Sequence, residues 1–323
     1  MHAENRRGFL KNMALFGGAA IVSGNLGEAL AQMAPDWKKQ IGLELFTVRD
    51  EMQNDFEGVL AKIASFGYKE VEPASGYNNM SPKDFRAMLD RYGLTMPSTH
   101  SGLPAGETLE KRFEGGQIMG LKYVENLGGP AGAPRPPAPP PAPRPPAAPR
   151  GGGQTEEAVK RQAQTLNENG KTAKKFGMKM IVHNHTGEFA PLADRPEAHP
   201  YGILLAETDP ELVTLQLDIG WASVAGQDIL ALFKKSPGRF ECWHVKDAMG
   251  LKFLGPELNQ NQRQQAAKLV PVGQGDVDYK SIFAAASIAG MKHFCIEQDN
   301  ANQWGDSVAA ARVSINGLTR ILS

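Results

Sequence analysis

Short apolar segments alternate with helix-like segments along most of this chain, and the alternation limits the folds it can adopt more than any other feature. Eight segments are predicted as β-strands, at 41–47, 69–73, 95–100, 121–126, 178–182, 213–218, 240–245 and 292–297. Helical patterns follow most of them, at 55–66, 81–93, 108–119, 155–176, 228–235, 279–289 and 307–321. Repeats of about 25–35 residues are typical of a parallel (β/α)8 barrel, the TIM barrel.

We therefore expect one α/β domain with this barrel fold over residues 37–323. Helix-end signals support the pattern, because Ser81 followed by Pro82 is typical of a helix start and Gly67 and Gly177 of helix ends. A doubly wound open sheet is the alternative. It is disfavoured because no glycine-rich phosphate loop follows the first strand.

The charge balance argues against two classes of partner. The chain has 323 residues with 35 basic and 35 acidic side chains, so there is no electrostatic basis for binding nucleic acid or an anionic membrane. Sugars and other small polar molecules remain as ligands. The sequence leaves a homo-oligomer possible.

The first 31 residues have the pattern of an export signal. Arg6 and Arg7 stand before Gly-Phe-Leu-Lys, a short apolar run follows from 13 to 22, and small residues precede Gln32. The run is too short to span a bilayer. We expect a twin-arginine signal peptide over 1–31, export to the periplasm or cell envelope, and no stable membrane insertion after cleavage. The alternative is a disordered basic tail.

Residues 128–153 interrupt the barrel pattern. They are nearly all Pro, Ala, Gly and Arg, and proline lacks the donor and the torsional freedom that helices and sheets require. We expect a low-complexity insertion after the fourth strand without a function of its own. A lid or a partner-docking arm is the alternative.

Groups that can bind a metal gather at the ends of the last four predicted strands. His183 ends the fifth strand and is followed by His185 and Glu188, while the next three strands end in Asp218, His244 and Glu297. In a barrel, functional residues collect at the carboxyl ends of the strands. Imidazoles with carboxylates suit Mn, Co, Zn, Fe or Mg, and the pattern predicts one divalent ion. Hydrogen-bonded structural histidines are the alternative for the fifth strand.

Two cysteines, Cys242 and Cys295, each precede a proposed ligand by two residues. They should lie on the inward face of adjacent strands. An oxidising compartment permits a disulfide, but we expect two buried free thiols.

Several motifs resemble the sugar phosphate isomerase/epimerase superfamily, the xylose isomerase-like barrels that include inosose dehydratases and, more distantly, endonuclease IV. The matching pieces are HNHTGEF at 183–189, LDIGW at 217–221, WHVKD at 243–247, VGQGD at 272–276 and IE at 296–297. With the barrel pattern they cover the chain from about residue 41 onward, apart from the insertion.

The resemblance implies a single divalent metal held by Asp218, His244, Glu297 and one group of the fifth strand. Many relatives have a glutamate where His183 stands, so His183 or Glu188 is expected to supply this ligand. His185 then faces the substrate. Epimerases of this superfamily use two metal-bound glutamates as acid and base, and this chain departs from that pattern.

Further residues have two interpretations each. Lys246 could donate a hydrogen bond or proton to a developing alkoxide, or form a rim salt bridge with Asp247. Glu72 and His100 are expected to bind substrate hydroxyls, with a structural polar role inside the barrel mouth as the alternative. Asn184 is in addition expected to contact the substrate. Trp221 could stack on a sugar ring or pack in the core.

The resulting expectation is a metal-dependent isomerase or epimerase that abstracts a proton α to a carbonyl of a non-phosphorylated sugar or keto-sugar, with Glu297 as base. The first alternative is a dehydratase or lyase that acts on an oxidised (3-keto) glycoside or an inosose. Two alternatives belong to other classes, a catalytically silent sugar-binding barrel and a nuclease of the endonuclease IV type. The neutral charge and the export signal argue against the nuclease.

Overall fold

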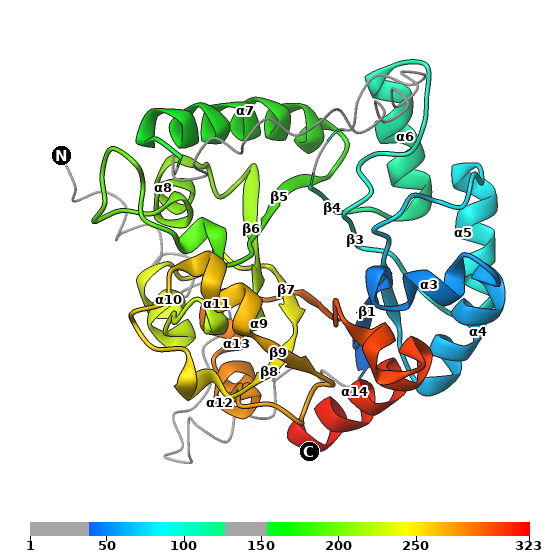
Figure 1. Ribbon diagram of the computed structural model, residues 1–323. Helices are drawn as coiled ribbons and strands as arrows, with labels where there is room; N and C mark the ends of the chain where they lie inside the picture. Colours follow the sequence, from blue (N-terminus) through cyan, green and yellow to red (C-terminus); the bar gives the residue numbers. More distant parts are fainter. Residues whose placement is uncertain (1–38, 126, 128–153) are drawn as a thin grey trace, which may run out of the picture. The chain divides into compact units, whose positions relative to one another are not determined.

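Eight parallel strands form a nearly closed barrel in the computed structural model, which describes residues 39–125, 127 and 154–323 (Figure 1). Around the barrel the strand order is β2-β1-β10-β7-β6-β5-β4-β3. Their bounds are β1 Gly42–Glu44, β2 Glu70–Glu72, β3 Ser98–Thr99, β4 Tyr123–Val124, β5 Lys179–His183, β6 Val213–Asp218, β7 Cys242–Val245 and β10 His293–Ile296. A parallel bridge between Glu70 and Thr95 joins β2 to the segment before β3. The predicted (β/α)8 fold is confirmed.

Helices surround the strands, and most begin at a side chain that caps them. Asp55, Ser81, Thr108, Thr155 and Asp228 each accept a hydrogen bond from a backbone N–H of the first turn, as expected for N-caps. The α-helices are α3 Arg49–Met52, α4 Phe56–Phe66, α5 Pro82–Arg91, α6 Leu109–Met119, α7 Glu156–Lys175, α8 Pro200–Glu207, α9 Ile219–Val224, α10 Ile229–Lys235, α11 Gln260–Ala266, α12 Tyr279–Ala284, α13 Ala286–Ala289 and α14 Ser307–Ile321.

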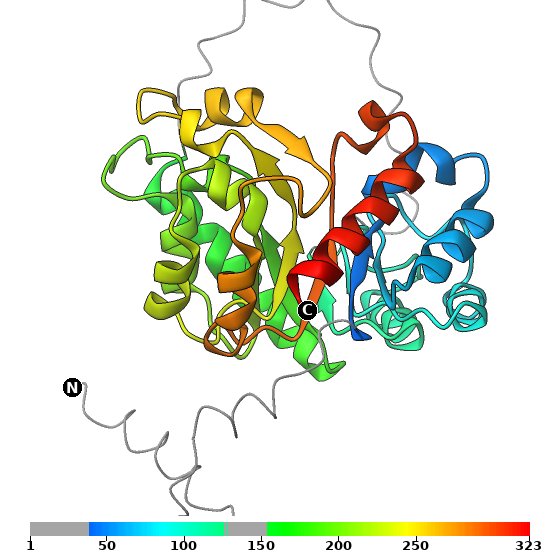
Figure 2. The ribbon, with the colours of Figure 1, turned by 90° about the horizontal axis from the view of Figure 1, so that it is seen from below.

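The long connection after β7 contains secondary structure of its own. Its two strands, β8 (Asp247–Met249) and β9 (Lys268–Val270), pair antiparallel, and α11 lies between them in sequence. Figure 2 shows this part, in yellow to orange, at one end of the barrel. Three-residue strands and a helix without a buried residue leave little hydrophobic periodicity, so the pattern could not predict them.

The first predicted strand is shorter than expected. β1 ends at Glu44 because the Glu44 carboxylate accepts a hydrogen bond from the Phe46 N–H at 2.9 Å, and the 3-10 helix Leu45–Val48 starts there.

The two cysteines are buried and free, as predicted.

At the amino ends of the strands, opposite the predicted site, a buried carboxylate ties four strands together. Glu241, directly before β7, accepts hydrogen bonds from Tyr123 and Lys179, both at 2.7 Å, and lies 3.0 Å from the Lys292 ammonium. Burial opposes ionisation of Glu241, but the bonds from Lys179, Tyr123 and Lys292 hold its pKa below the ordinary value.

We expect Glu241→Gln to lower the free energy of unfolding by about 1–3 kcal/mol at neutral pH, because charge-assisted bonds are lost. The lowered pKa of Glu241 means that its stabilisation is complete above the unfolded-state pKa of about 4.3 and disappears as the pH falls through the folded-state value. Urea denaturation at pH 7 and at pH 3–4 measures this. A wild-type advantage that does not shrink in acid would contradict it.

Two predictions lie outside the described residues, the signal peptide over 1–31 and the insertion over 128–153, and both stay predictions. Within the part of the chain that the structure describes, no helix is long and apolar enough to cross a membrane.

Candidate metal centre

Four side chains from four neighbouring strands meet at the carboxyl end of the barrel. His183 ends β5, Asp218 ends β6, His244 lies in β7, and Glu297 directly follows β10. The strand register places Asp218 beside His244, and the Glu297 N–H donates to the Val245 carbonyl of β7 at 3.2 Å. One ligand atom from each of the four lies within 4.8 Å of the others. We call these four residues the ligand cluster.

Local hydrogen bonds fix the orientation of Asp218. One carboxylate oxygen, Oδ1, accepts from the Trp221 N–H at 2.7 Å and caps α9. The Asn184 side chain accepts from the Asp218 N–H at 3.0 Å and donates to its carbonyl at 3.2 Å. The second carboxylate oxygen, Oδ2, is thereby directed to the cluster. Asn184 is fully buried, which favours this positioning role over the predicted contact with substrate.

The His244 ring is held from behind by a carboxylate of the opposite barrel wall. Its Nε2 lies 2.9 Å from Glu72 Oε1, which leaves Nδ1 directed to Glu297. Glu72 is fully buried and also binds His100, Ser98 and Gln216. A carboxylate on the far nitrogen of a metal-binding histidine sets its tautomer and raises its basicity. Glu72, predicted to contact substrate, is therefore better suited to orienting His244.

We expect Glu72→Gln to weaken divalent-metal affinity by about 10- to 100-fold, the usual effect of losing such a partner. Metal titration against a competing chelator measures this, with Glu241→Gln as the matched control at the other barrel end. Equal affinities in wild type and Glu72→Gln would show that the carboxylate does not act through His244.

The donor set fits a divalent cation. Asp218 Oδ2, His244 Nδ1 and Glu297 Oε2 are buried, and none has a hydrogen-bond partner of good geometry among the described residues. Burial, together with the His244 and His100 rings, lowers the pKa of His183 well below its ordinary value, so this ring is neutral and can act as a ligand. Although burial opposes it, Lys246 and His244 hold the pKa of Glu297 well below the usual range. Two imidazoles and two carboxylates match Zn, Mn, Fe or Co.

Lys246 lies inside the cluster rather than at the rim. Its ammonium is fully buried and lies 3.0 Å from Asp218, 3.1 Å from Glu297 and 2.6 Å from Asp299. Burial alone would lower the pKa of Lys246, but these carboxylates raise it above the ordinary value, so the group stays charged. The alternative of a salt bridge with Asp247 is wrong.

Asp247 organises the loop after β9 instead. Its carboxylate accepts from the N–H groups of Gly273 and Gly275, both at 2.9 Å, and from Ala248 and Val277. A Cβ added at Gly275 would lie 2.1 Å from this carboxylate, so the close approach requires glycine. This contact links the two motifs WHVKD and VGQGD and braces the strand end that carries Lys246.

Of the two proposed fifth-strand ligands, only His183 belongs to the ligand cluster. Glu188 lies in the 3-10 helix η3 (Gly187–Phe189), where its carboxylate accepts from the His185 N–H at 2.7 Å. The His185 ring is exposed, with its centroid 5.0 Å from that of His183 and 6.1 Å from that of Trp221. This placement suits the expected role of His185 in facing a substrate.

His100 and Trp221 border the cluster. The His100 ring lies 4.9 Å from His183 and 5.0 Å from His244, and these three histidines form a second, overlapping group of possible ligands. The carboxylate of Glu72 raises the pKa of His100 to about 10 against the effect of burial. Trp221 is 5% exposed and packs in a small apolar cluster with Val224, Ala248 and Leu269, which favours the core role.

Sequence patterns missed three polar groups of the site. Gln216 bridges His100 and Glu72, Asp299 pairs with Lys246, and Glu44 is buried at the end of β1. Burial and the nearby Glu297 raise the pKa of Glu44 well above its ordinary value. Glu44 and Gln216 each interrupt an apolar strand, which is the one local signal that could have revealed them.

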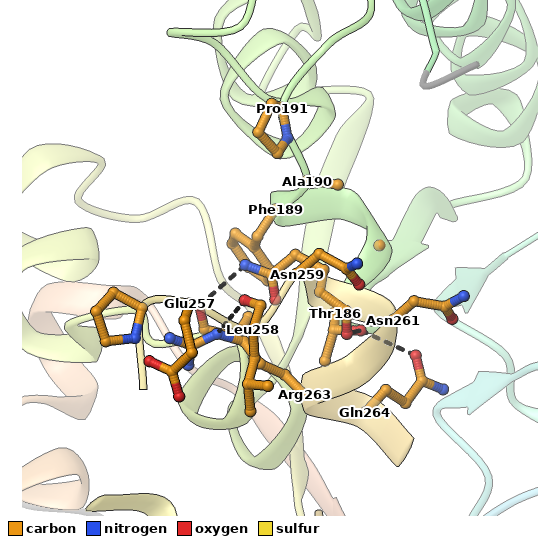
Figure 3. A pocket seen from close by; sticks show the side chains of 14 residues that line it. Thr186, Phe189, Ala190, Pro191, Glu257, Leu258, Asn259, Asn261, Arg263 and Gln264 are labelled. Carbon is orange, nitrogen blue, oxygen red and sulfur yellow. Dashed lines mark hydrogen bonds between the residues drawn. The ribbon is translucent and has the colours of Figure 1, made fainter. Parts of the chain in front are cut away.

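A pocket of about 860 Å³ lies apart from the ligand cluster, between η3 and α11 (Figure 3). Thr186 joins its walls by donating to the Gln260 carbonyl at 3.0 Å and to the Gln264 side chain at 2.9 Å. Phe189, Pro191 and several amide side chains line it, but no member of the ligand cluster does. This pocket is therefore distinct from the ligand cluster.

A family model described as xylose isomerase-like TIM barrel matches residues 60–319. Among solved structures, the fold is similar to a sugar phosphate isomerase/epimerase from Parabacteroides distasonis, with a TM-score of 0.65 and 20% identity over 93% of this chain and 96% of that one. It is also similar to the IOLI protein with a bound zinc atom, with a TM-score of 0.58 and 14% identity over 88% of this chain and 98% of that one.

Among curated proteins, an inosose dehydratase of Clostridium tetani is 33% identical over 133 residues, which are 40% of this chain and 43% of that enzyme. The chain thus spans less than half the length of this relative. The donor set of the ligand cluster in this chain by itself suits a divalent metal.

Proposed function

The chain belongs to the xylose isomerase-like TIM barrel family, and from this premise we propose a divalent-metal-dependent enzyme that abstracts a proton next to the carbonyl of a non-phosphorylated keto-sugar or keto-polyol. One observation carries the proposal. His183, Asp218, His244 and Glu297 bring their ligand atoms within 4.8 Å of one another at the carboxyl end of the barrel, where enzymes with this fold have their active sites.

When bound, the metal would act as a Lewis acid that stabilises the enediolate formed from the substrate carbonyl. Glu297 is the proposed base, because a general base must be unprotonated and the lowered pKa keeps this carboxylate ionised. Lys246 stays an ammonium at 3.1 Å from this carboxylate. It can donate a hydrogen bond to an oxygen on which negative charge develops.

Elimination is the reaction outcome we favour. Glu297 takes the α-proton, the C–H electrons form a carbon–carbon double bond, and the β-oxygen leaves with a proton from His185. The cluster holds only one glutamate, so the symmetrical pair of carboxylates expected of an epimerase is not present in it. The curated relatives named inosose dehydratases support the same outcome.

Isomerisation or epimerisation is the second candidate. Strands β5 and β10 are separated by β6 and β7, so His185 and Glu297 approach the cluster from its two sides. Glu297 would remove a proton from one face of the substrate and His185 would return one to the other. The similar structure of a sugar phosphate isomerase/epimerase is consistent with this outcome at the level of the fold.

A phosphorylated substrate suits the site poorly. Four carboxylates surround it, from Glu72, Asp218, Glu297 and Asp299, and among the described residues Lys246 is the one lysine or arginine paired with them. That ammonium is fully buried and already has three partners. A phosphate dianion would therefore find this ammonium already engaged by three carboxylates.

The test is exchange of carbon-bound hydrogen in D2O, followed by NMR with inososes, ketoses and 3-keto-glucosides, with Mn²⁺ or with EDTA. The proposal predicts metal-dependent deuterium uptake with at least one of them. A product that has lost water or the aglycone indicates elimination, and an epimer indicates the second candidate. A metal-loaded protein that binds a sugar without exchange would indicate a silent binding barrel.

A further inference from the structure

The Lys246 ammonium contacts carboxylate oxygens that belong to the ligand cluster. It contacts Asp218 Oδ2 at 3.0 Å and Glu297 Oε2 at 3.1 Å, and neither oxygen has a hydrogen-bond partner of good geometry among the described residues, which is also true of Asp299 Oδ2. Lys246 is 0% exposed, so its charge is not screened by solvent. The ammonium therefore neutralises the carboxylates that a divalent cation would otherwise neutralise.

A third carboxylate gives the ammonium an alternative partner. Asp299 Oδ2 lies 2.6 Å from Lys246 Nζ, closer than either carboxylate of the ligand cluster. Asp299 follows Glu297 by two residues, is not one of the cluster, and its side chain is 27% exposed. The Trp221 ring, centred 4.9 Å from Nζ, bounds another side of the ammonium and favours retention of a cation there.

Like charges cannot share these oxygens without cost. A divalent cation bound to Asp218 and Glu297 would lie only a few ångströms from an ammonium that contacts the same atoms, in a site with little solvent screening. Removal of the ammonium from the site would leave Asp299 as an unpaired, partly buried carboxylate. The repulsion between the two cations is smallest when the metal binds the ligand cluster and the ammonium pairs with Asp299 alone.

We propose that Lys246 is an internal counter-ion that competes with the metal for Asp218 and Glu297, and that Asp299 is the positioning residue that holds the ammonium when the metal is bound. The pair then sets the metal affinity of the site. This inference rests on the metal centre of the proposed function, but it does not depend on which reaction the enzyme catalyses.

Two substitutions have opposite expected effects. Lys246→Met keeps a side chain of similar length and removes the competing charge, so affinity for Mn²⁺ or Zn²⁺ should rise about tenfold or more. Asp299→Asn leaves the ammonium with only the cluster carboxylates as charged partners. Metal affinity should then fall by about three- to tenfold.

The experiment measures the affinity of the full chain for Mn²⁺ and Zn²⁺ by competition with a chelator, in wild type, both single variants and the double variant. Glu188→Gln is the matched control, because glutamine can still accept from the His185 N–H. Since Asp299 acts through Lys246, the effect of Asp299→Asn should largely disappear in the Lys246→Met background. Circular dichroism of the metal-free proteins verifies folding.

Three results would overturn the inference. Lys246→Met could leave affinity unchanged or lower it, which would exclude competition. Asp299→Asn could have the same effect in both backgrounds, which would make Asp299 an ordinary negative charge near the metal. If Lys246→Met does not fold, unchanged affinity in Asp299→Asn alone contradicts the proposal. Failure of the proposed function is separate, since these affinities are measured without substrate.

Discussion

Replacing Glu297 by glutamine should slow metal-dependent hydrogen–deuterium exchange of the substrate by about 10²- to 10⁴-fold, the usual contribution of a general base. Glutamine has nearly the same shape and retains an oxygen, but it cannot accept a proton. It also loses the charge that pairs with Lys246 and His244, so a weaker metal affinity is expected as well. NMR exchange rates at saturating Mn²⁺ separate the two effects.

Glu188→Gln is the control for this measurement. Glu188 follows the cluster residue His183 closely in sequence, but it does not belong to the cluster. Its exchange rate should stay close to that of wild type. If Glu297→Gln retains full exchange at saturating metal, another group is the base. Asp299 and Glu44 would then be the next carboxylates to test as the base.

The second large effect is expected at the fifth strand. His183→Ala should lower affinity for a divalent cation at least about 100-fold, because a direct ligand contributes more than the outer partners whose loss costs 10- to 100-fold. Glu188→Ala should leave affinity within a few-fold of wild type, since its carboxylate is used by the His185 N–H. Chelator competition and metal content after purification measure both.

His183→Glu is the conservative variant for the same position. A carboxylate can replace imidazole as a ligand of such cations, so this variant should regain much of the affinity that His183→Ala loses. The opposite ranking, with a large loss in Glu188→Ala and none in His183→Ala, would assign the ligand to Glu188 and require η3 to rearrange.

Local patterns were sufficient for the barrel because each element carries its own signal. The capped helix starts at Asp55, Ser81 and Thr155 and the apolar strand of β6 are short-range features, and the structure has them where they were expected. The excursion after β7 has no such signal. Its strands are three residues long, and α11 has no buried residue.

The site was predictable to the extent that its residues stand at strand ends. His183, Asp218, His244 and Glu297 could be nominated because parallel strands of a barrel bring their carboxyl ends together. The hydrogen-bond and ion-pair partners of these four residues could not be predicted from the sequence. Their contacts reach across the barrel or depend on the paths of loops. Glu72 reaches His244 from a strand 172 residues earlier in the chain.

The partners of Lys246 also could not be predicted from the sequence, even though one candidate was its direct neighbour. Its neighbour in sequence, Asp247, was the obvious partner for an ion pair, yet adjacent residues of a strand point to opposite faces. The structure directs Lys246 to the cluster and Asp247 to the glycine loop at 273–275. Asp299 can pair with Lys246 because β10 lies beside β7, a long-range contact that no local pattern predicts.

The most direct test of the central claim is anomalous X-ray scattering from crystals of the protein loaded with Mn²⁺ or Zn²⁺, measured on both sides of the metal absorption edge. The account predicts one anomalous peak bonded to His183, Asp218, His244 and Glu297, with Glu188 outside the coordination sphere. A peak bound elsewhere, or no peak at this cluster in metal-loaded crystals, would contradict it.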